Sequence, residues 1–388
     1  MENKQTNGWK IVAILMMVLA LTVTGLYATE VRKNKKAPDT DTTVVEPVEE
    51  DLTFLTLWNE DAKAKNELEA FVKDVTDENS ANFVPVENRV AVFDLDGTLF
   101  CETDPVYFDH MLLKYRVEQD PGHEPTELEL KAVAGVQEFI DTGVYPEGLD
   151  NLHGQGVASA FAGMTIKEFY EYVRKFGKTP CPGYNNMNIG DAFYLPMLEV
   201  IEYLQDNDFE VYIVSGTDRL IVRGAASGVD FLNIPANHII GSDELIVASN
   251  QGDTDGLEYV YSSDDDLILA GEFIVKNLKM NKVTVIQQEI GVQPILSFGN
   301  SSGDYSMANY TVMNNPYRSM AFMLCCDDTV RENGNTEKAE KMAKACEENG
   351  WVAISMKNDW KTIYGDEVTR KQECMNKLPD EKNRQFFR

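Results

Sequence analysis

The chain has 388 residues, enough for one large or two modest domains, and 43% of them are hydrophobic, which suffices for a packed core. Its formal net charge of -29 at pH 7 argues against a nucleic-acid surface, because phosphates favour Lys and Arg clusters and none stands out beyond residue 36. A small solute or a metal cation suits this composition better.

The amino terminus has the pattern of an export signal. Lys4 and Lys10 precede an uncharged run over residues 11–28 that is long enough to approach a bilayer span. Residues 1–28 are expected to be either a removed signal peptide or an uncleaved signal anchor, since the end of the run matches a cleavage site poorly. Basic residues at 32–36 oppose export on the positive-inside rule. We nevertheless expect an extracytoplasmic protein, secreted or anchored to the membrane by this segment, because a short cationic start before an apolar run is the common export signal.

Residues 29–52 read as a linker rich in Thr, Pro and acidic residues, without apolar periodicity. Folded structure is expected from residue 53. An amphipathic helix follows, because apolar side chains recur there at helical spacing, at Leu68, Phe71, Val72 and Val75.

Two aspartates follow the first strand-like run. Residues 90–93 are continuously apolar, which is typical of a strand buried on both faces of a parallel sheet. Asp94 would stand at the carboxyl end of that strand, where ligands bind in open α/β sheets. Asp96 lies two residues further on, and Gly97 permits a sharp turn. An Asp-Gly turn without function remains the alternative at this point.

A second apolar run, residues 209–214, leads into Ser215 and Gly216. A hydroxyl beside a permissive glycine offers neighbouring backbone amides that could hold an oxyanion. A helix is expected before this strand, because Pro196 suits a first turn and apolar residues recur after it. A simple turn would explain the Ser-Gly pair equally well.

A third apolar run, residues 295–298, leads into the stretch GNSSGD. This stretch offers Asn300 and Asp304 as oxygen ligands four residues apart, and hard cations prefer such ligands. A loop followed by a helix cap is the alternative for this stretch alone. The three strand ends taken together, and in this order, favour one functional site.

These features resemble the motifs of a known family. DxDGT from Asp94, the strand-borne Ser215, a lysine, and GNSxGD ending at Asp304 are similar to the four motifs of the haloacid dehalogenase (HAD) superfamily. Longer stretches, "FVPVENRVAVFDLDGTLFCE", "YLPMLEVIEYLQDNDFEVYIVSG", "KVTVIQQEIGVQPILSFGNSSGD" and "WVAISMKNDW", resemble its bacterial phosphoserine-phosphatase-like branch. The likeness runs from about residue 58 to residue 364. It implies an α/β fold in which a doubly wound parallel sheet forms a Rossmann-like core with an inserted helical cap.

The resemblance also identifies the lysine. Spacing alone leaves Lys276, Lys279 and Lys282 open, and Lys282 stands where the lysine of the family precedes the last motif. We expect the other two to be solvated. Asn300 replaces the aspartate of many superfamily members, so the implied metal site loses one formal charge.

The implied chemistry is phosphoryl transfer with Mg²⁺. Asp94 would attack the phosphorus and form an aspartyl-phosphate, and Asp96 would protonate the leaving alcohol and then activate water. The implied Mg²⁺ ligands are Asp94, the Asp96 backbone carbonyl, Asn300 and Asp304. The implied phosphate-binding groups are Ser215, the amides around Gly216, and Lys282.

About 120 residues separate Asp94 from Ser215, far more than an ordinary strand connection needs, so a cap must be inserted. Helical spacing at 125–140 and 165–176 and a return hinge near 180–190 support it. We expect the core to occupy 53–104 and 188–364, the cap 105–187, and a polar, loosely ordered tail 365–388.

One acid and two histidines lie near or within the expected cap. Glu102 is expected to point toward the cap and the substrate, with a solvated hinge acid as the alternative. His110 and His153 lack ligand spacing and are expected to be surface or packing residues. The six cysteines lack zinc-site spacing, and most are expected to be small buried hydrophobes.

The sequence therefore predicts an enzyme, a Mg²⁺-dependent hydrolase of small phosphomonoesters. The alternatives are a phosphomutase of the same superfamily and a non-catalytic surface protein that binds phosphorylated ligands. The neutral Asn300 is the best hint of the latter, whereas Asp94, Asp96, Lys282 and Asp304 oppose it.

Overall fold

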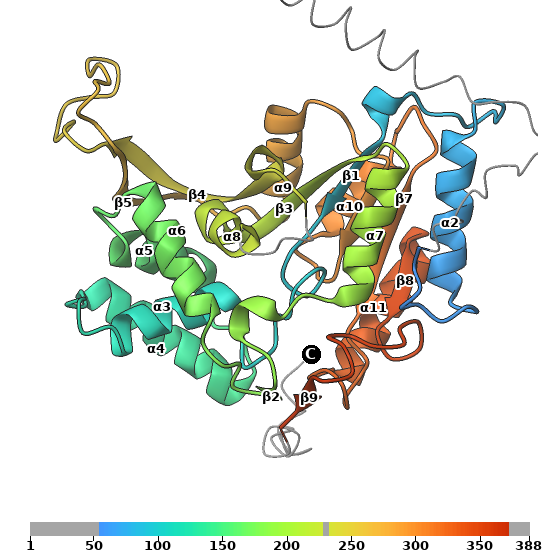
Figure 1. Cartoon of the computed structure of the whole chain (residues 1–388), viewed down its shortest axis with the longest axis horizontal. Helices are drawn as coiled ribbons and strands as arrows, with labels where there is room; N and C mark the ends of the chain where they lie inside the picture. The colour runs from blue at the N-terminus through green and yellow to red at the C-terminus, as the bar shows by residue number, and fades with distance from the viewer. Residues whose placement is uncertain (1–53, 228–232, 372–388) are drawn as a thin grey trace, which may run out of the picture. The chain divides into compact units, whose positions relative to one another are not determined.

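The computed structural model describes residues 54–227 and 233–371 (Figure 1). The expected export segment 1–28 and linker 29–52 lie outside the described residues, as do residues 372–388. In the part of the chain that is described, no helix is both long enough and apolar enough to cross a membrane.

A seven-stranded sheet in the order β5-β4-β3-β1-β6-β7-β8 forms the centre of the described chain. The strands are β1 Val90–Phe93, β3 Glu210–Asp218, β4 Ile239–Ala248, β5 Leu267–Val275, β6 Leu296–Gly299, β7 Met320–Cys325 and β8 Val352–Ser355. Neighbours from β4 to β8 are parallel, and β1 lies between β3 and β6. The predicted α/β fold with a doubly wound sheet is confirmed. One strand departs from it, since β5 pairs antiparallel with β4 at the edge.

Helices cover both faces of the sheet, which explains why all four residues of β1 are buried. Ala91 and Phe93 share an apolar cluster with α2 and α7, whereas Val90 and Val92 share another with α9 and α10. The helices are α2 Lys63–Thr76, α3 Phe108–Glu118, α4 Glu127–Thr142, α5 Leu149–Ala160, α6 Ile166–Gly177, α7 Leu195–Asp206, α8 Arg219–Ala226, α9 Met280–Val285, α10 Tyr305–Val312 and α11 Thr336–Asn349.

Four helices, α3 to α6, are inserted between β1 and β3. α4 and α6 begin where capping boxes satisfy their first amides, Thr126 with Glu129 and Thr165 with Glu168. The helical patterns at 125–140 and 165–176 match these two helices. Figure 1 shows the β4-β5 hairpin reaching the inserted helices, and the Leu269 backbone amide donates to the Met164 carbonyl at 3.0 Å. The sequence analysis did not anticipate this hairpin.

The segment after Tyr364 is not loosely ordered as far as residue 371, contrary to expectation. Thr369–Arg370 form β9, which pairs antiparallel with β2, Tyr184–Asn185, near the end of the inserted region. The five cysteines of the described residues are free, and four of them are buried, as expected of small hydrophobes. Cys374 lies outside the described residues.

Candidate active site

The carboxyl ends of three neighbouring parallel strands form the site. Asp94 follows β1, Ser215 lies near the end of β3, and Asp304 follows β6. Because β1 lies between β3 and β6, these ends meet at one edge of the sheet. The backbone amide of Asp94 donates to the carbonyl of Phe298 at 2.9 Å, which continues the β1-β6 ladder into the site.

Lys282 joins two acidic residues of this edge. Its Nζ lies 2.5 Å from Asp94 Oδ1 and 2.7 Å from Asp304 Oδ1, and its side chain is fully buried in α9. Burial alone would lower the pKa of Lys282, but the carboxylates of Asp304 and Asp94 outweigh burial and raise it. The ammonium group therefore stays charged where an anionic substrate would need it.

The Asp94 carboxyl is buried close to a second negative charge. Burial, with the nearby charge of Asp304, raises the pKa of Asp94 to about 7, although Lys282 opposes the shift. Asp304 is held on its other side, since its Oδ2 accepts from the backbone amides of Asn300 and Ser301 at 3.1 Å each. The loop after β6 is thus wrapped around the carboxylate that contacts Lys282.

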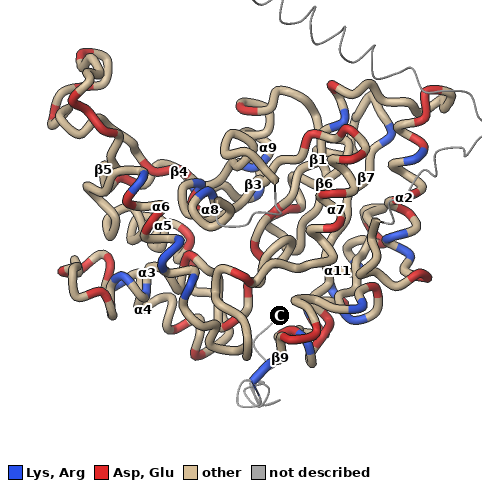
Figure 2. The backbone as a smooth tube through the Cα atoms, viewed as in Figure 1, with Lys and Arg blue, Asp and Glu red and all other residues tan. Residues whose placement is uncertain are grey.

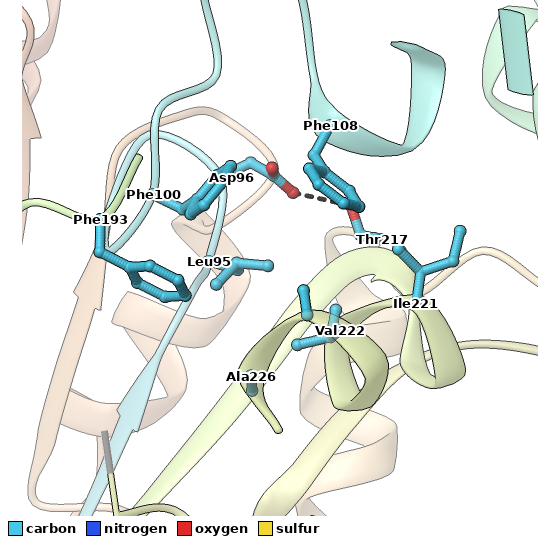
Figure 3. A pocket seen from close by; sticks show the side chains of 10 residues that line it. Leu95, Asp96, Phe100, Phe108, Phe193, Thr217, Ile221, Val222 and Ala226 are labelled. Atoms are coloured by element: carbon cyan, nitrogen blue, oxygen red, sulfur yellow. Dashed lines mark hydrogen bonds between the residues drawn. The ribbon is translucent and has the colours of Figure 1, made fainter. Parts of the chain in front are cut away.

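Asp96 occupies a different environment two residues away. The Thr217 hydroxyl donates to Asp96 Oδ2 at 2.7 Å, while Oδ1 is buried and has no partner within residues 54–227 and 233–371 (Figure 3). Burial, followed by the charges of Asp109 and Asp94, raises the pKa of Asp96 well above its usual range. This carboxyl therefore favours its protonated form more than an ordinary aspartate does, as a proton donor requires.

An apolar cavity borders Asp96 and accounts for much of this burial (Figure 3). It lies between the loop after β1, the start of α3 and helix α8. Besides Asp96 its lining comprises Leu95, Phe100, Phe108, Phe193, Thr217, Ile221, Val222, Ala225 and Ala226. Few polar groups are available there to solvate a negative charge.

The turn after Asp96 depends on Gly97, whose φ of +76° favours glycine. A Cβ at this position would lie 1.8 Å from Asn300 Nδ2 and 2.8 Å from the Glu102 carboxyl carbon. Asn300 Nδ2 donates to Glu102 Oε2 at 3.0 Å. Burial raises the pKa of Glu102 to about 7. Glu102 therefore lies against the metal-ligand candidate Asn300 rather than in solvent.

Ser215 and Gly216 are brought to the same edge and are held there by residues that sequence reasoning missed. Ser215 is fully buried, its Oγ accepts from the Thr217 amide at 3.0 Å, and its carbonyl accepts from Asn277 Nδ2 at 2.9 Å. The Gly216 carbonyl accepts from Ser242 Oγ at 2.6 Å. Thr217 follows the Ser-Gly pair directly, so its position in the sequence could have indicated a role. Asn277 and Ser242 are distant in sequence, and only the folding of the chain brings them to the site.

The oxygen atoms around Asp94 fit a hard cation. Asp94, Glu102, Asn300 and the backbone carbonyl of Asp96 offer oxygens, and Asp304 lies next to them. Asp94 is buried and Glu102 is partly buried, and the raised pKa values of both carboxyl groups indicate a site where a divalent cation would offset crowded negative charge. The donor set accordingly suits Mg²⁺.

The surroundings of the site are negatively charged. Acidic residues occur over both the sheet region and the inserted helices (Figure 2). An anionic substrate therefore needs local cations to offset repulsion from the rest of the protein. Lys282 supplies one such charge. Lys279 is exposed as expected, whereas Lys276 is half-buried and lines a cavity beside the inserted helices.

Two histidines lie in the interior of the inserted helices, in agreement with the expectation of packing residues. His110 and His153 are both buried, and their rings stack with centroids 3.9 Å apart. They lie beside Asp109, and the three together form a polar cluster inside the inserted helices.

Comparison with known proteins gives one family. The model of haloacid dehalogenase-like hydrolases matches residues 91–309, a range that contains Asp94, Ser215, Lys282 and Asp304. No curated protein matches the chain.

Several solved structures are distantly similar. A conserved functionally unknown protein from Anaerococcus prevotii DSM 20548 has 13% identity and a TM-score of 0.45, over 75% of this chain and 91% of that one. A phosphoserine phosphohydrolase-like protein from Francisella tularensis subsp. tularensis SCHU S4 has 15% identity and a TM-score of 0.36, over 69% and 94%. Cytosolic 5'-nucleotidase IIIB bound to cytidine has 11% identity and a TM-score of 0.45, over 76% and 87%.

Proposed function

This chain belongs to the haloacid dehalogenase-like hydrolases, and from that membership we propose that it is a Mg²⁺-dependent phosphatase of small phosphomonoesters. The observation that carries the proposal is the contrast between two acids. Asp94 contacts the buried cation Lys282. Asp96 lies beside an apolar cavity, and its pKa is strongly raised. Such divergent environments suit a nucleophile and a general acid.

In the first step Asp94 attacks phosphorus, the new O–P bond forms an aspartyl-phosphate, and the bond to the leaving alcohol oxygen breaks. Asp96 gives that oxygen its proton. The Thr217 hydrogen bond orients the Asp96 carboxyl for this transfer and stabilises the carboxylate that results. In the second step the Asp96 carboxylate takes a proton from water, which attacks the acyl phosphate and releases inorganic phosphate.

Charge neutralisation comes from fixed donors around Asp94. Lys282 binds a phosphoryl oxygen, and Asp304 holds the lysine in place through its 2.7 Å contact. Asp94, the Asp96 carbonyl, Asn300 and Asp304 would hold Mg²⁺, with Glu102 orienting Asn300 through its amide. When bound, Mg²⁺ supplies Lewis-acid stabilisation of the phosphoryl charge. Ser215 and the amides near Gly216 complete the proposed phosphate site.

We place the chain in the phosphoserine-phosphatase-like branch on the strength of its GNSxGD stretch with Asn300. Helices α3 to α6 support a cap over about residues 105–187, inserted in a core of 53–104 and 188–364. The cap would exclude water from the acyl phosphate and contact the leaving group. We also propose that the domain lies outside the cytoplasm, secreted or tethered by residues 1–28, since that run has the export pattern. Protease added to intact cells should then remove it.

A panel of phosphomonoesters, assayed for released inorganic phosphate with Mg²⁺ and with excess EDTA, tests the activity. Turnover that needs Mg²⁺ supports the proposal, and transfer of phosphate to a sugar without its release would point to a mutase. Undiminished turnover in EDTA would exclude the metal-assisted mechanism. If no phosphomonoester turns over, a binding protein becomes the better account.

A further inference from the structure

Three polar side chains meet inside the inserted helices, away from the strand ends. Asp109 and His110 lie in the first turn of α3, and His153 lies in α5. Their exposed fractions are 2%, 2% and 1%. Asp109 Oδ1 is 2.7 Å from His110 Nδ1, and Asp109 Oδ2 is 3.8 Å from His153 Nδ1.

The bonding of His153 is incomplete. Neither ring nitrogen has a hydrogen-bond partner within the described residues, since 3.8 Å to Asp109 is too long for one. A buried imidazole without partners costs free energy, and such groups in native proteins call for a ligand. His153 therefore offers a buried ring nitrogen that could bind a ligand and that no side chain among the described residues occupies.

The protonation states of the cluster favour a cation. Burial and the neighbouring His110 lower the pKa of His153 well below its usual range, so the ring is neutral and one of its nitrogens has a free lone pair. Although burial opposes the shift, the adjacent His153 and His110, with the hydrogen bond between His110 and Asp109, lower the pKa of Asp109 and favour its carboxylate. Metal ions bind these two forms, the neutral imidazole and the carboxylate.

We propose that Asp109, His110 and His153 bind a divalent transition-metal ion, of which Zn²⁺ is the leading example. One donor atom from each residue lies within 4.8 Å of the other two. Ligands about 2.0–2.1 Å from a tetrahedral ion stand about 3.3 Å apart. The distances from His110 Nδ1 to Asp109 Oδ1, 2.7 Å, and from His153 Nδ1 to Asp109 Oδ2, 3.8 Å, are close enough that small shifts would bring the donors to that spacing. Imidazole with one carboxylate selects Zn²⁺ and similar ions over Mg²⁺.

Three protein ligands leave a coordination position open, as in catalytic rather than structural zinc sites. Asp109 and His153 line a cavity between the inserted helices and the core, together with Ser242, Glu244 and Lys276. A water molecule or a donor atom of a substrate can therefore reach the ion from this cavity. The ion would also join α3 to α5 and so stabilise the cap.

Metal content separates this site from the Mg²⁺ site of the proposed phosphatase. The full-length chain is stripped with a chelator, mixed with excess Mg²⁺ to fill the carboxylate site, and titrated with Zn²⁺ or with Co²⁺ as a spectroscopic probe. We expect one Zn²⁺ per chain, a visible Co²⁺ spectrum with nitrogen ligands, and a higher unfolding temperature on Zn²⁺ addition. His153→Ala and Asp109→Asn should each weaken Zn²⁺ binding by at least about 100-fold.

Two controls bind Zn²⁺ as the wild type does if the assignment is right. His238→Ala removes a histidine that already contacts the Val211 carbonyl and the Tyr212 ring. Asp94→Asn alters the catalytic carboxylates only. Circular dichroism checks that every variant is folded, and if one ligand variant is not, the other decides the result. The absence of stoichiometric Zn²⁺ binding to the wild type, or equal binding by a folded ligand variant, would overturn the proposal.

Discussion

Lys282 Nζ lies 2.5 Å from Asp94 Oδ1, so the cation proposed to bind the phosphate is held by the carboxylate proposed to attack it. Asp304 holds the same ammonium from its other side at 2.7 Å. Both carboxylates and the lysine are buried. The arrangement keeps a positive charge beside the nucleophile before any substrate enters, which is the preorganisation that phosphoryl transfer requires.

Replacing this cation should unbalance two buried acids. Lys282→Met leaves Asp94 and Asp304 without their partner, and we expect the free energy of unfolding to fall by about 3–5 kcal/mol. Urea denaturation monitored by circular dichroism measures the change. Lys279→Met, at an exposed position in the same segment, should stay within about 0.5 kcal/mol of the wild type. Equal losses in the two variants would contradict the role given to Lys282.

Gly97 tests how tightly the turn is packed against the metal-ligand candidates. Gly97→Ala would press a methyl group onto Asn300, whereas Gly291→Ala has a similar φ of +74° and meets no atom within 4 Å. Both variants should lose about 1–2 kcal/mol of stability through backbone strain. Only Gly97→Ala should weaken Mg²⁺ binding, by about 10- to 100-fold, as read from the Mg²⁺ dependence of turnover. If Mg²⁺ binding weakens equally in both variants, the contact with Asn300 does not matter for the metal.

Thr217 should matter for catalysis although the sequence analysis gave it no role. Thr217→Val removes the hydroxyl that donates to Asp96 and should lower kcat about 10- to 100-fold, because such a bond to a charged group is worth about 1.5–3 kcal/mol. Thr311→Val is a matched control, since that buried hydroxyl donates to the Met307 carbonyl within α10. Unchanged kcat in Thr217→Val would remove Thr217 from the mechanism.

Local pattern explains what the sequence could predict. The strand of residues 90–93 and the helices α4 and α6 are encoded by adjacent residues, and they appear where expected. The meeting of Asp94 with Asp304 follows from strand order, which the family resemblance implied. The β4-β5 hairpin could not be anticipated in this way, because its contacts with the inserted helices join residues far apart in the chain, such as Leu269 and Met164, which are 105 positions apart (269 − 164).

Contacts that form only in the folded chain could not be predicted in this way. His110 and His153 are separated by α4 in the chain, so their spacing carries no ligand signature, and only the packing of α3 against α5 brings them together. Asn277 reaches the Ser215 carbonyl from the loop after β5. Contacts made by tertiary packing leave no local periodicity to read.

Glu244 should make the stability of the fold depend on pH. Burial, with the charges of Asp218 and Asp243, raises its pKa from 4.5 to about 9, and neither of its carboxylate oxygens has a partner among the described residues. The folded state therefore holds a proton that the unfolded state has already lost, and stability falls as pH rises from the unfolded pKa to the folded one.

Glu244→Gln removes this proton linkage. In the presence of a chelator, the unfolding temperature of the wild type should fall from about pH 5.5 to about pH 8.5 more steeply than that of the variant. Differential scanning calorimetry at both pH values gives the comparison. If the two proteins show parallel pH profiles, Glu244 is not the titrating group.

Trapping of the phosphoenzyme distinguishes Asp94 as the nucleophile from Asp96 as the proton carrier. Wild type, Asp94→Asn and Asp96→Asn are each mixed with an aryl phosphate and Mg²⁺, quenched in acid and mapped by mass spectrometry. The good leaving group needs little proton donation, so Asp96→Asn should be slowed more in hydrolysis than in phosphorylation and should accumulate one phosphoryl group on the peptide containing Asp94. Asp94→Asn should carry none and should not turn over. Near-wild-type turnover by Asp94→Asn, or a phosphoryl group on Ser215, would contradict the account.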